Sequence, residues 1–182
     1  MIPSAEQCYE LMKEYGMLDH IRAHSITVEK VASIIARGLR DAGENLMPDK
    51  VKAGAWMHDI AKTLCLNTRE DHAEKGREIC LKHHLDEIAD IVGEHIRLKG
   101  YQRDAPVSEK EVVYYADKRV NADVVVSLHD RLKYLLEHYG NGNALICRKI
   151  TENFDLCREV ERKLFAKLDF DPQDVAGLIE KE

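Results

Sequence analysis

The stretch DKVKAGAWMHDIAK, residues 49–62, sets His58 beside Asp59 within a segment of helical pattern. Pro48 suits the first turn of the helix that is predicted to carry this pair. His58 shares one helical face with Val51 and Ala55, so its imidazole should point into the core. An imidazole and a carboxylate side by side can hold one metal ion through nitrogen and oxygen. The pair therefore indicates metal-assisted hydrolysis.

Length and composition favour a single globular domain over residues 1–182. A chain of 182 residues can bury a sizeable core without disulfides or other staples. The net charge of −6 and the pI near 5.9 come from charged residues spread along the whole chain. Because there is no basic block of the kind that a duplex-binding protein carries, we expect no nucleic-acid partner.

The cysteines and the apolar segments bear on the cellular compartment. The cysteines show no CxxC spacing and are expected to be free, partly buried thiols, which fits a reducing cytoplasm; they are Cys8, Cys65, Cys80, Cys147 and Cys157. No stretch approaches the ~18 apolar residues of a membrane span, and the N-terminus lacks a charged segment followed by an apolar run. The sequence predicts a soluble, cytoplasmic protein without a membrane partner.

Apolar residues recur at helical spacing along almost the whole chain. Ser4 with Gln7, and Ser108 with Glu111, have the spacing of a capping box at a helix start. Helices are predicted over residues 5–15, from 19 up to Gly43, from 48 through the His-Asp pair, over 72–83 and 86–97, from 109 onward, over 144–168, and briefly from 172. Residues 67–71 and 99–106 are predicted loops, and 140–143 a break between helices.

The helix that follows Ser108 is predicted to continue, with a bend, through Leu128 and Leu132 to Tyr139. The valines at 124–126 form an apolar run too short to outweigh these helical flanks. No alternating apolar and polar run is long enough for a half-buried strand. The predicted fold class is all-α.

Five potential metal ligands lie on inward-facing stripes of the predicted helices: His24, His58, His72, His95 and Asp117. Burying so many ionisable groups without partners would cost several kcal/mol. A single buried histidine is more often a hydrogen-bonded core residue than a ligand. The set as a whole favours a shared metal centre, because a metal would offset the cost of burial.

These residues resemble the HD-domain superfamily of metal-dependent phosphohydrolases. The family order of a histidine, a His-Asp pair and a later aspartate matches His24 in HSITV, His58 and Asp59 in MHDIAK, and Asp117 in YYADK. Two further histidines, His72 in HAEKG and His95 in GEHI, are similar to the binuclear branch of the family. Bacterial diadenosine tetraphosphate hydrolases of the HD superfamily are the most similar proteins on this pattern.

The resemblance covers about residues 20–121 and implies an HD-domain helical bundle. Residues 122–182 would add further C-terminal helices, which could complete the core, cover the active site or form a homodimer surface. The segment after His95 reads IRLKG, where those hydrolases have a Thr-Gly-Arg-Pro pattern. This departure concerns the substrate more than the metal site.

The resemblance also implies a ligand set. His24, His58, Asp59 and Asp117 would hold one metal ion, and Asp59 would bridge to a second ion held by His72 and His95. Two cations ~3.5–4 Å apart can activate a water molecule, clamp phosphate oxygens and neutralise the charge of an in-line displacement. Imidazole and carboxylate ligands suit iron, manganese, cobalt or zinc, and the resemblance favours iron.

His83 and His84 are rivals of His72 for the second ion. At ~1.5 Å per residue, His83 would lie roughly 16 Å along the helix from His72, so only one of them can reach the cluster. We favour His72, because it begins its helix beside the loop after the His-Asp pair, whereas the other two would lie at a helix end. His20, one turn before His24, could touch substrate, but a surface or core role is the simpler interpretation.

Two residues are assigned catalytic roles. Asp59 would orient the nucleophile as a bridging ligand, and Lys62, four residues after His58, should project near the metals and could bind a substrate phosphate. A solvated surface lysine is the alternative for Lys62. Other cations are weaker candidates, because most helical charges face water: Arg97, Lys99, Arg103, Lys118 and Arg119.

The expected function is hydrolysis of a phosphoester or phosphoanhydride bond in a small phosphorylated molecule. A nucleotide or dinucleotide is the favoured substrate. A mononuclear nucleotidase and a cyclic-nucleotide or dinucleotide phosphodiesterase are alternatives within the enzyme class. A nucleotide-binding regulator without turnover is the alternative outside it. The intact set of ligands argues against that regulator.

Overall fold

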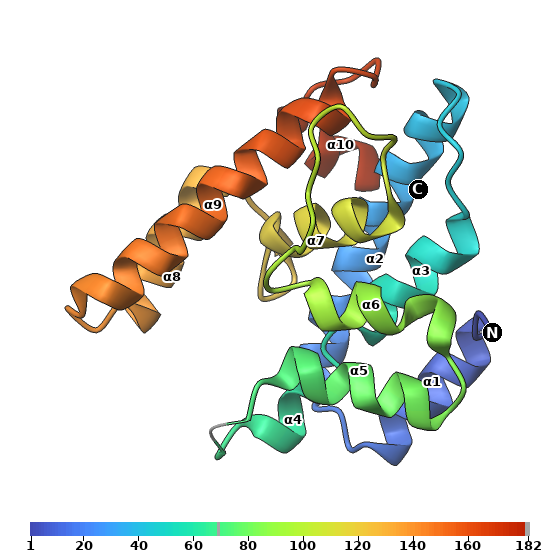
Figure 1. Cartoon of the computed structure of the whole chain (residues 1–182), viewed down its shortest axis with the longest axis vertical. Helices are drawn as coiled ribbons and strands as arrows, with labels where there is room; N and C mark the ends of the chain where they lie inside the picture. Colours follow the sequence, from blue (N-terminus) through green and yellow to red (C-terminus); the bar gives the residue numbers. More distant parts are fainter. Residues whose placement is uncertain (69, 181–182) are drawn as a thin grey trace.

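The computed structural model describes residues 1–68 and 70–180 and confirms the all-α class (Figure 1). The helices of the described residues are α1 (Ala5–Glu14), α2 (Asp19–Asp41), α3 (Pro48–Met57), α4 (Lys62–Cys65), α5 (His72–Lys82), α6 (Asp86–Glu94), α7 (Glu109–Lys118), α8 (Leu128–Tyr139), α9 (Ala144–Phe165), the 3-10 helix η1 (Pro172–Asp174) and α10 (Val175–Ile179). Two short strands, β1 (Val120–Asn121) and β2 (Val124–Val125), pair antiparallel. Arg69, in a predicted loop, and the last two residues of the predicted domain lie outside the described residues.

The capping signals in the sequence mark true helix starts. Ser4 accepts a hydrogen bond from the backbone of Gln7 while the Gln7 side chain accepts from the backbone of Ser4, and Ser108 and Glu111 repeat this arrangement. Each box satisfies two backbone donors that the first turn of a helix leaves free. Both predicted capping boxes are confirmed.

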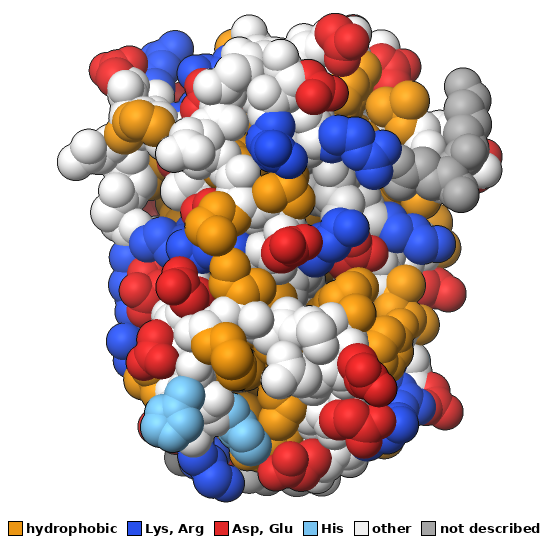
Figure 2. Space-filling model, turned by 90° about the vertical axis from the view of Figure 1, so that its right-hand side faces the viewer, with side chains coloured by type: hydrophobic (Ala, Val, Ile, Leu, Met, Phe, Trp, Pro, Cys, Tyr) orange, Lys and Arg blue, Asp and Glu red, His pale blue; other side chains and the backbone are white. Residues whose placement is uncertain are grey.

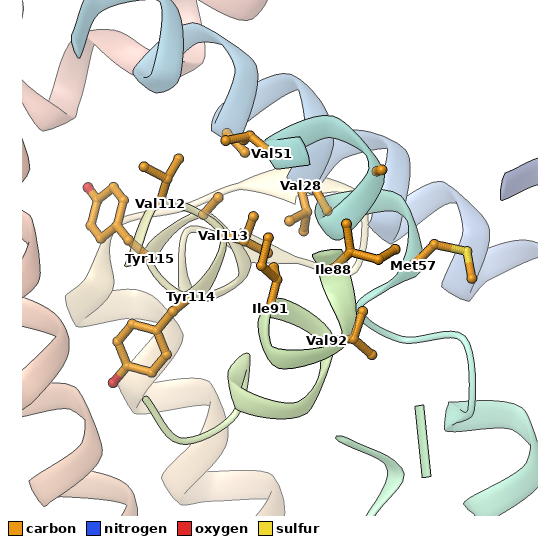
Figure 3. Packing of buried hydrophobic residues seen from close by; sticks show 14 of the residues in the cluster. Val28, Val51, Met57, Ile88, Ile91, Val92, Val112, Val113, Tyr114 and Tyr115 are labelled. Atoms are coloured by element: carbon orange, nitrogen blue, oxygen red, sulfur yellow. The ribbon is translucent and has the colours of Figure 1, made fainter. Parts of the chain in front are cut away.

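The core forms around α2, against which α3, α7 and α10 pack, while α5 and α6 form a helical hairpin joined to α3 and α7 through α6. Figure 3 shows buried side chains of four of these helices meeting: Val28 of α2, Val51 and Met57 of α3, Ile88, Ile91 and Val92 of α6, and Val112, Val113, Tyr114 and Tyr115 of α7. The predicted free thiols are confirmed, since all five cysteines are unpaired, four of them buried and Cys147 partly exposed.

Two glycines allow α6 to approach its neighbours closely. A Cβ atom at Gly54 would lie 2.6 Å from Cγ2 of Ile91, and one at Gly76 would lie 2.7 Å from Cγ1 of Val92. A side chain at either position would push α3 or α5 away from α6, since these β-branched neighbours have few rotamers to give way. The glycines thus allow close packing of the helices that end just before His58 and His95 or begin at His72.

The sequence predicts that the helix from Pro48 carries the His-Asp pair. This prediction is wrong, because α3 ends at Met57. Nδ1 of His58 donates a hydrogen bond to the carbonyl of Ala55 at 2.6 Å, the acceptor that the backbone N–H of Asp59 would use in a continuing helix. α6 ends early for the same reason: Nδ1 of His95 donates to the carbonyl of Val92 at 2.7 Å, and the helix stops at Glu94 rather than Arg97. In both cases the imidazole replaces the backbone donor.

The predicted continuation of α7 to Tyr139 is also wrong. α7 ends at Lys118, and β1 and β2 form a hairpin whose turn residue Ala122 has a positive φ of 51°. Tertiary contacts favour this turn over a helix: the carbonyl of Ala122 accepts from Nδ1 of His24 at 2.7 Å, and that of Asp123 accepts from Oγ1 of Thr27 at 3.2 Å. The short valine run that the sequence pattern assigned to a helix is therefore strand at Val124–Val125.

α8 and α9 pair as a helical hairpin that projects from the body of the molecule (Figure 1). α9 ends at Phe165, a few residues before the predicted end, and packs on α7 through its C-terminal half. Figure 2 shows a face of the molecule on which acidic, basic and hydrophobic side chains are interspersed. Among the described residues, no helix is long and apolar enough to cross a membrane.

Candidate metal centre

The structure brings all six predicted ligand residues into one cluster. His24 comes from α2, His58 and Asp59 follow α3, His72 begins α5, His95 follows α6 and Asp117 lies near the end of α7. His24, His58, Asp59 and His95 are buried, whereas the side chains of His72 and Asp117 keep 24% and 15% of their exposure. The cluster therefore opens to solvent on the side of His72 and Asp117.

The carboxylate of Asp59 lies at the centre and divides its two oxygens between two sets of histidines. Oδ2 lies 3.5 Å from Nε2 of His58 and 3.9 Å from Nε2 of His24. Oδ1 lies 3.2 Å from Nε2 of His72 and 3.5 Å from Nε2 of His95. Two groups of three residues thus share Asp59, and within each group the ligand atoms lie within 4.8 Å of one another.

Asp117 adds a second carboxylate to one of these groups. Its Oδ1 lies 3.1 Å from Nε2 of His24 and 3.6 Å from Nε2 of His58. His24, His58, Asp59 and Asp117 therefore surround one small volume, and Asp59, His72 and His95 surround a neighbouring one.

The backbone orients three of the imidazoles so that Nε2 faces the carboxylates. Nδ1 of His24, His58 and His95 each donates to a backbone carbonyl, at 2.6–2.7 Å. In a neutral imidazole, protonation of Nδ1 leaves Nε2 with a free lone pair. Metal-ligating histidines typically have this arrangement, with the second ring nitrogen donating to a carbonyl or carboxylate. The Nε2 atom of His58 is buried and has no hydrogen-bond partner.

Lone pairs that face carboxylate oxygens repel unless a cation lies between them. Protons can fill that role only in part: Asp59 and Asp117 raise the pKa of His58 to about 10 against the opposing effect of burial, whereas burial lowers the pKa of His95 to about 4. The pKa of Asp59 stays well below its usual value, because the surrounding histidines overcome the effect of burial. Divalent transition-metal ions fit this donor set of imidazole nitrogens and carboxylate oxygens.

Two lysines border the cluster in different ways. Nζ of Lys62 donates to Oδ2 of Asp59 at 2.7 Å, and 36% of its side chain is exposed. Burial alone would lower the pKa of Lys62, but Asp59 holds it above its usual value, with smaller contributions from Asp117 and Tyr139. Lys62 therefore lies at the open rim as an ammonium.

Lys118, ranked low in the sequence as one of many solvated charges, is buried. Its Nζ donates to Oδ2 of Asp117 at 3.1 Å and to the carbonyl of His95. Arg119 is buried as well and holds the β1–β2 hairpin through a bond to the carbonyl of Val126 at 2.7 Å. The sequence offered no signal that separated these two cations from exposed ones, since each also bonds to a carbonyl far away in the sequence, Lys118 to that of His95 and Arg119 to that of Pro172.

The other candidates from the sequence are exposed or have a partner outside the cluster. Nε2 of His83 is 2.9 Å from the hydroxyl of Tyr15, beside α1, and His84 is exposed. His20 is exposed at the start of α2. The remaining weak cation candidates are exposed: Arg97, Lys99 and Arg103.

Comparison with known protein families identifies this arrangement. The HD domain matches residues 21–135, more than half of the chain. The chain belongs to the HD-domain family. Membership places this HD domain among proteins of the metal-dependent phosphohydrolase superfamily, and all six clustered residues lie within the matched segment.

Curated relatives match this HD domain over part of their own length. A tRNA (cytidine(56)-2'-O)-methyltransferase from Picrophilus torridus is 32% identical over 170 residues, 83% of this chain and 46% of the relative. A protein of the same name from Thermoplasma volcanium is 33% identical over 97 residues, 53% of this chain and 27% of the relative. A ribonuclease Y from Ureaplasma parvum serovar 3 is 37% identical over 73 residues, 40% of this chain and 14% of the relative.

The HD domain thus spans less than half the length of these curated relatives. None of the three has the name of a dinucleotide hydrolase, so the similarity to diadenosine tetraphosphate hydrolases stays a prediction. No solved structure gives a significant match.

Replacing Lys118 with methionine should weaken metal binding while leaving every ligand in place. The ammonium holds both the Asp117 carboxylate and the His95 backbone, and loss of such an outer partner typically weakens metal affinity about 10–100-fold. Calorimetric titration with manganese measures the change. Lys110→Met is the matched control, because Lys110 lies on the same helix and pairs with Glu94 at 2.9 Å instead. Equal affinities in Lys118→Met and wild type would contradict the positioning role.

Proposed function

We propose that this HD domain is a phosphohydrolase that uses two metal ions to cleave a phosphoester or phosphoanhydride bond of a nucleotide. The observation that carries the proposal is the division of the Asp59 carboxylate, with one oxygen toward His24 and His58 and the other toward His72 and His95. A single ion would need only one of these groups. Without a second ion, the ring nitrogens of His72 and His95 that face Asp59 would lack a partner, and polar atoms without a partner are costly to bury.

Each proposed ion has its own ligands. His24, His58, Asp59 and Asp117 would hold the first, and Asp59, His72 and His95 the second. When bound, the ions would act as Lewis acids on phosphate oxygens and activate a water molecule for attack. Iron is the metal we favour, and manganese, cobalt and zinc accept the same ligands.

The side chains at the open rim would bind the substrate. The exposed part of Lys62 can reach a phosphate oxygen as a point charge while its partner Asp59 stays in the cluster. His72 and Asp117 are the most exposed of the ligands and would lie nearest the reacting phosphorus. Asp59 would orient the attacking water, since it would contact both ions.

A phosphodiester bond in RNA is a second candidate target. Two of the relatives have names of proteins that act on tRNA, and the third is named as a ribonuclease. The net charge of −6 and the lack of a basic block favour a small nucleotide over a duplex, which requires several phosphate contacts. We therefore place the mononucleotide or dinucleotide substrate first.

Asp59→Asn should abolish hydrolysis and preserve the fold. The amide keeps the size of the side chain but removes the charge and one of the oxygens that both proposed ions share. Wild type and variant would be assayed on mononucleotides, dinucleoside polyphosphates, cyclic nucleotides and a short RNA, each with iron, manganese, cobalt and zinc, and circular dichroism would check the helices. Comparable activity in the variant would remove Asp59 from the mechanism. Intact wild-type protein without activity on any of these substrates would favour a regulator.

If the domain binds two ions, its metal content should be close to two equivalents after anaerobic loading with iron. His72→Ala should reduce the content to about one equivalent, because His72 contacts only the second group. His83→Ala is the matched control, since that histidine bonds to Tyr15 instead. Elemental analysis that gives one equivalent in wild type and in His72→Ala would contradict two-metal binding.

Lys62→Ala should lower kcat/KM without changing the metal content. A hydrogen bond to a charged group contributes about 1.5–3 kcal/mol, which corresponds to roughly 10–150-fold in rate. Lys75→Ala on α5 serves as the control for loss of one positive charge, since the Lys75 side chain is 38% exposed and pairs with Glu78 at 3.3 Å. Steady-state kinetics on the best nucleotide substrate would give the answer, and an unchanged kcat/KM would mean that Lys62 serves only as the partner of Asp59.

A further inference from the structure

A cation and two aromatic rings follow one another along α8. Arg131, Tyr134 and His138 lie three and four residues apart, a spacing that puts them on one helical face. The rings of Tyr134 and His138 are stacked, with centroids 3.9 Å apart and planes inclined by 21°. The guanidinium of Arg131 lies 5.6 Å from the centroid of the Tyr134 ring. We call these three residues the α8 stack.

The α8 stack is held in place before any ligand arrives. Nδ1 of His138 donates to the carbonyl of Tyr134 at 2.8 Å, which fixes the imidazole over the phenol. Nη1 of Arg131 donates to Oδ1 of Asn121 at 2.6 Å. His138 is exposed and Tyr134 is half-buried, so an aromatic ring system is presented to solvent in a fixed orientation. Because these side chains are already ordered, binding of a ligand there costs less side-chain entropy.

The N-terminal part of α8 connects to the metal centre. Asn121, the partner of Arg131, precedes Ala122, whose carbonyl accepts the hydrogen bond from Nδ1 of His24. Tyr134 and His138 follow Arg131 by three and seven residues on the same helical face.

The α8 stack is suited to bind a flat ring, which can stack on its aromatic side chains. Nucleobases stack on aromatic side chains in a way that tolerates any base, because every base has a π-face. The apolar residues Leu132 and Leu135 of α8 are packed against the core, whereas the α8 stack includes the exposed ring of His138. A nucleotide carries both a phosphate for the metal centre and a base for the stack.

We infer that the α8 stack binds the nucleobase of the substrate while its phosphate lies at the metal centre. The inference rests on the proposed function and deepens it, since it makes the nucleobase part of what the domain recognises. Tyr134 and His138 would be specificity-determining residues, and Arg131 would hold the phenol face in position.

Calorimetry with a matched pair of ligands tests this inference. Adenosine 5′-monophosphate and ribose 5-phosphate carry the same phosphate and sugar but differ in the base, and both would be titrated into manganese-loaded protein, with 31P NMR to verify that they stay intact. Base stacking typically contributes enough to strengthen binding about 10-fold. We expect adenosine monophosphate to bind wild type about 10-fold more tightly than ribose 5-phosphate.

Variants of α8 locate the effect. Tyr134→Leu and His138→Ala should bring the two affinities to within about 2-fold of each other and leave that of ribose 5-phosphate unchanged. His129→Ala should keep the wild-type ratio, because His129 is nine residues from His138 and so lies roughly on the opposite side of the helix. Circular dichroism of all three variants would verify the helices.

The outcomes separate this inference from the proposed function. Equal affinity of wild type for the two ligands, or a ratio that Tyr134→Leu and His138→Ala leave unchanged, would overturn the role of the α8 stack while the phosphate site stands. Absence of binding by both ligands would overturn the phosphate site and the stack together. Tighter binding of tetraadenylate than of adenosine monophosphate, with the same sensitivity to Tyr134→Leu, would support base stacking and make the source of the base an RNA strand.

Discussion

The arrangement of the metal centre depends on the burial of one carboxylate. Asp59 is 1% exposed, and an isolated carboxylate in that position would be strongly unfavourable. Four imidazoles and the Lys62 ammonium surround it, and they come from four different parts of the chain. The helices that supply these groups must therefore take fixed positions relative to Asp59, and the glycines at the contacts with α6 let α3 and α5 come close enough.

The metal centre also sets where secondary structure stops. His58 and His95 each end a helix, because Nδ1 donates a hydrogen bond to a carbonyl that a backbone N–H would otherwise use. Nδ1 of His24 donates in the same way to the carbonyl of Ala122 in the β1–β2 turn. One interaction serves two purposes in each case: it satisfies a backbone acceptor at a helix end or turn, and it aims Nε2 at the carboxylates. These positions combine fold and chemistry, so their replacement would disturb both.

This coupling explains which features the sequence could reveal. The capping boxes at Ser4 and Ser108 are local, because all their partners lie within three residues, and the inward stripes follow from helical spacing alone. The β1–β2 hairpin was missed because its turn is stabilised by α2, roughly a hundred residues earlier in the chain. Lys118 was undervalued for a similar reason: one of its acceptors is the carbonyl of His95, and its burial results from packing that no local pattern encodes.

Exposure decides what the two lysines beside the aspartates can do. Lys118 is buried and uses its ammonium on Asp117 and the His95 carbonyl, so it can only hold the ligands in place. Lys62 pairs with Asp59 and keeps 36% of its side chain exposed. As metal ions would neutralise Asp59, the attraction that ties Lys62 to it would weaken, and the ammonium could turn toward a phosphate that arrives from the open side. The same charge that stabilises the buried carboxylate would then become available for substrate at the rim.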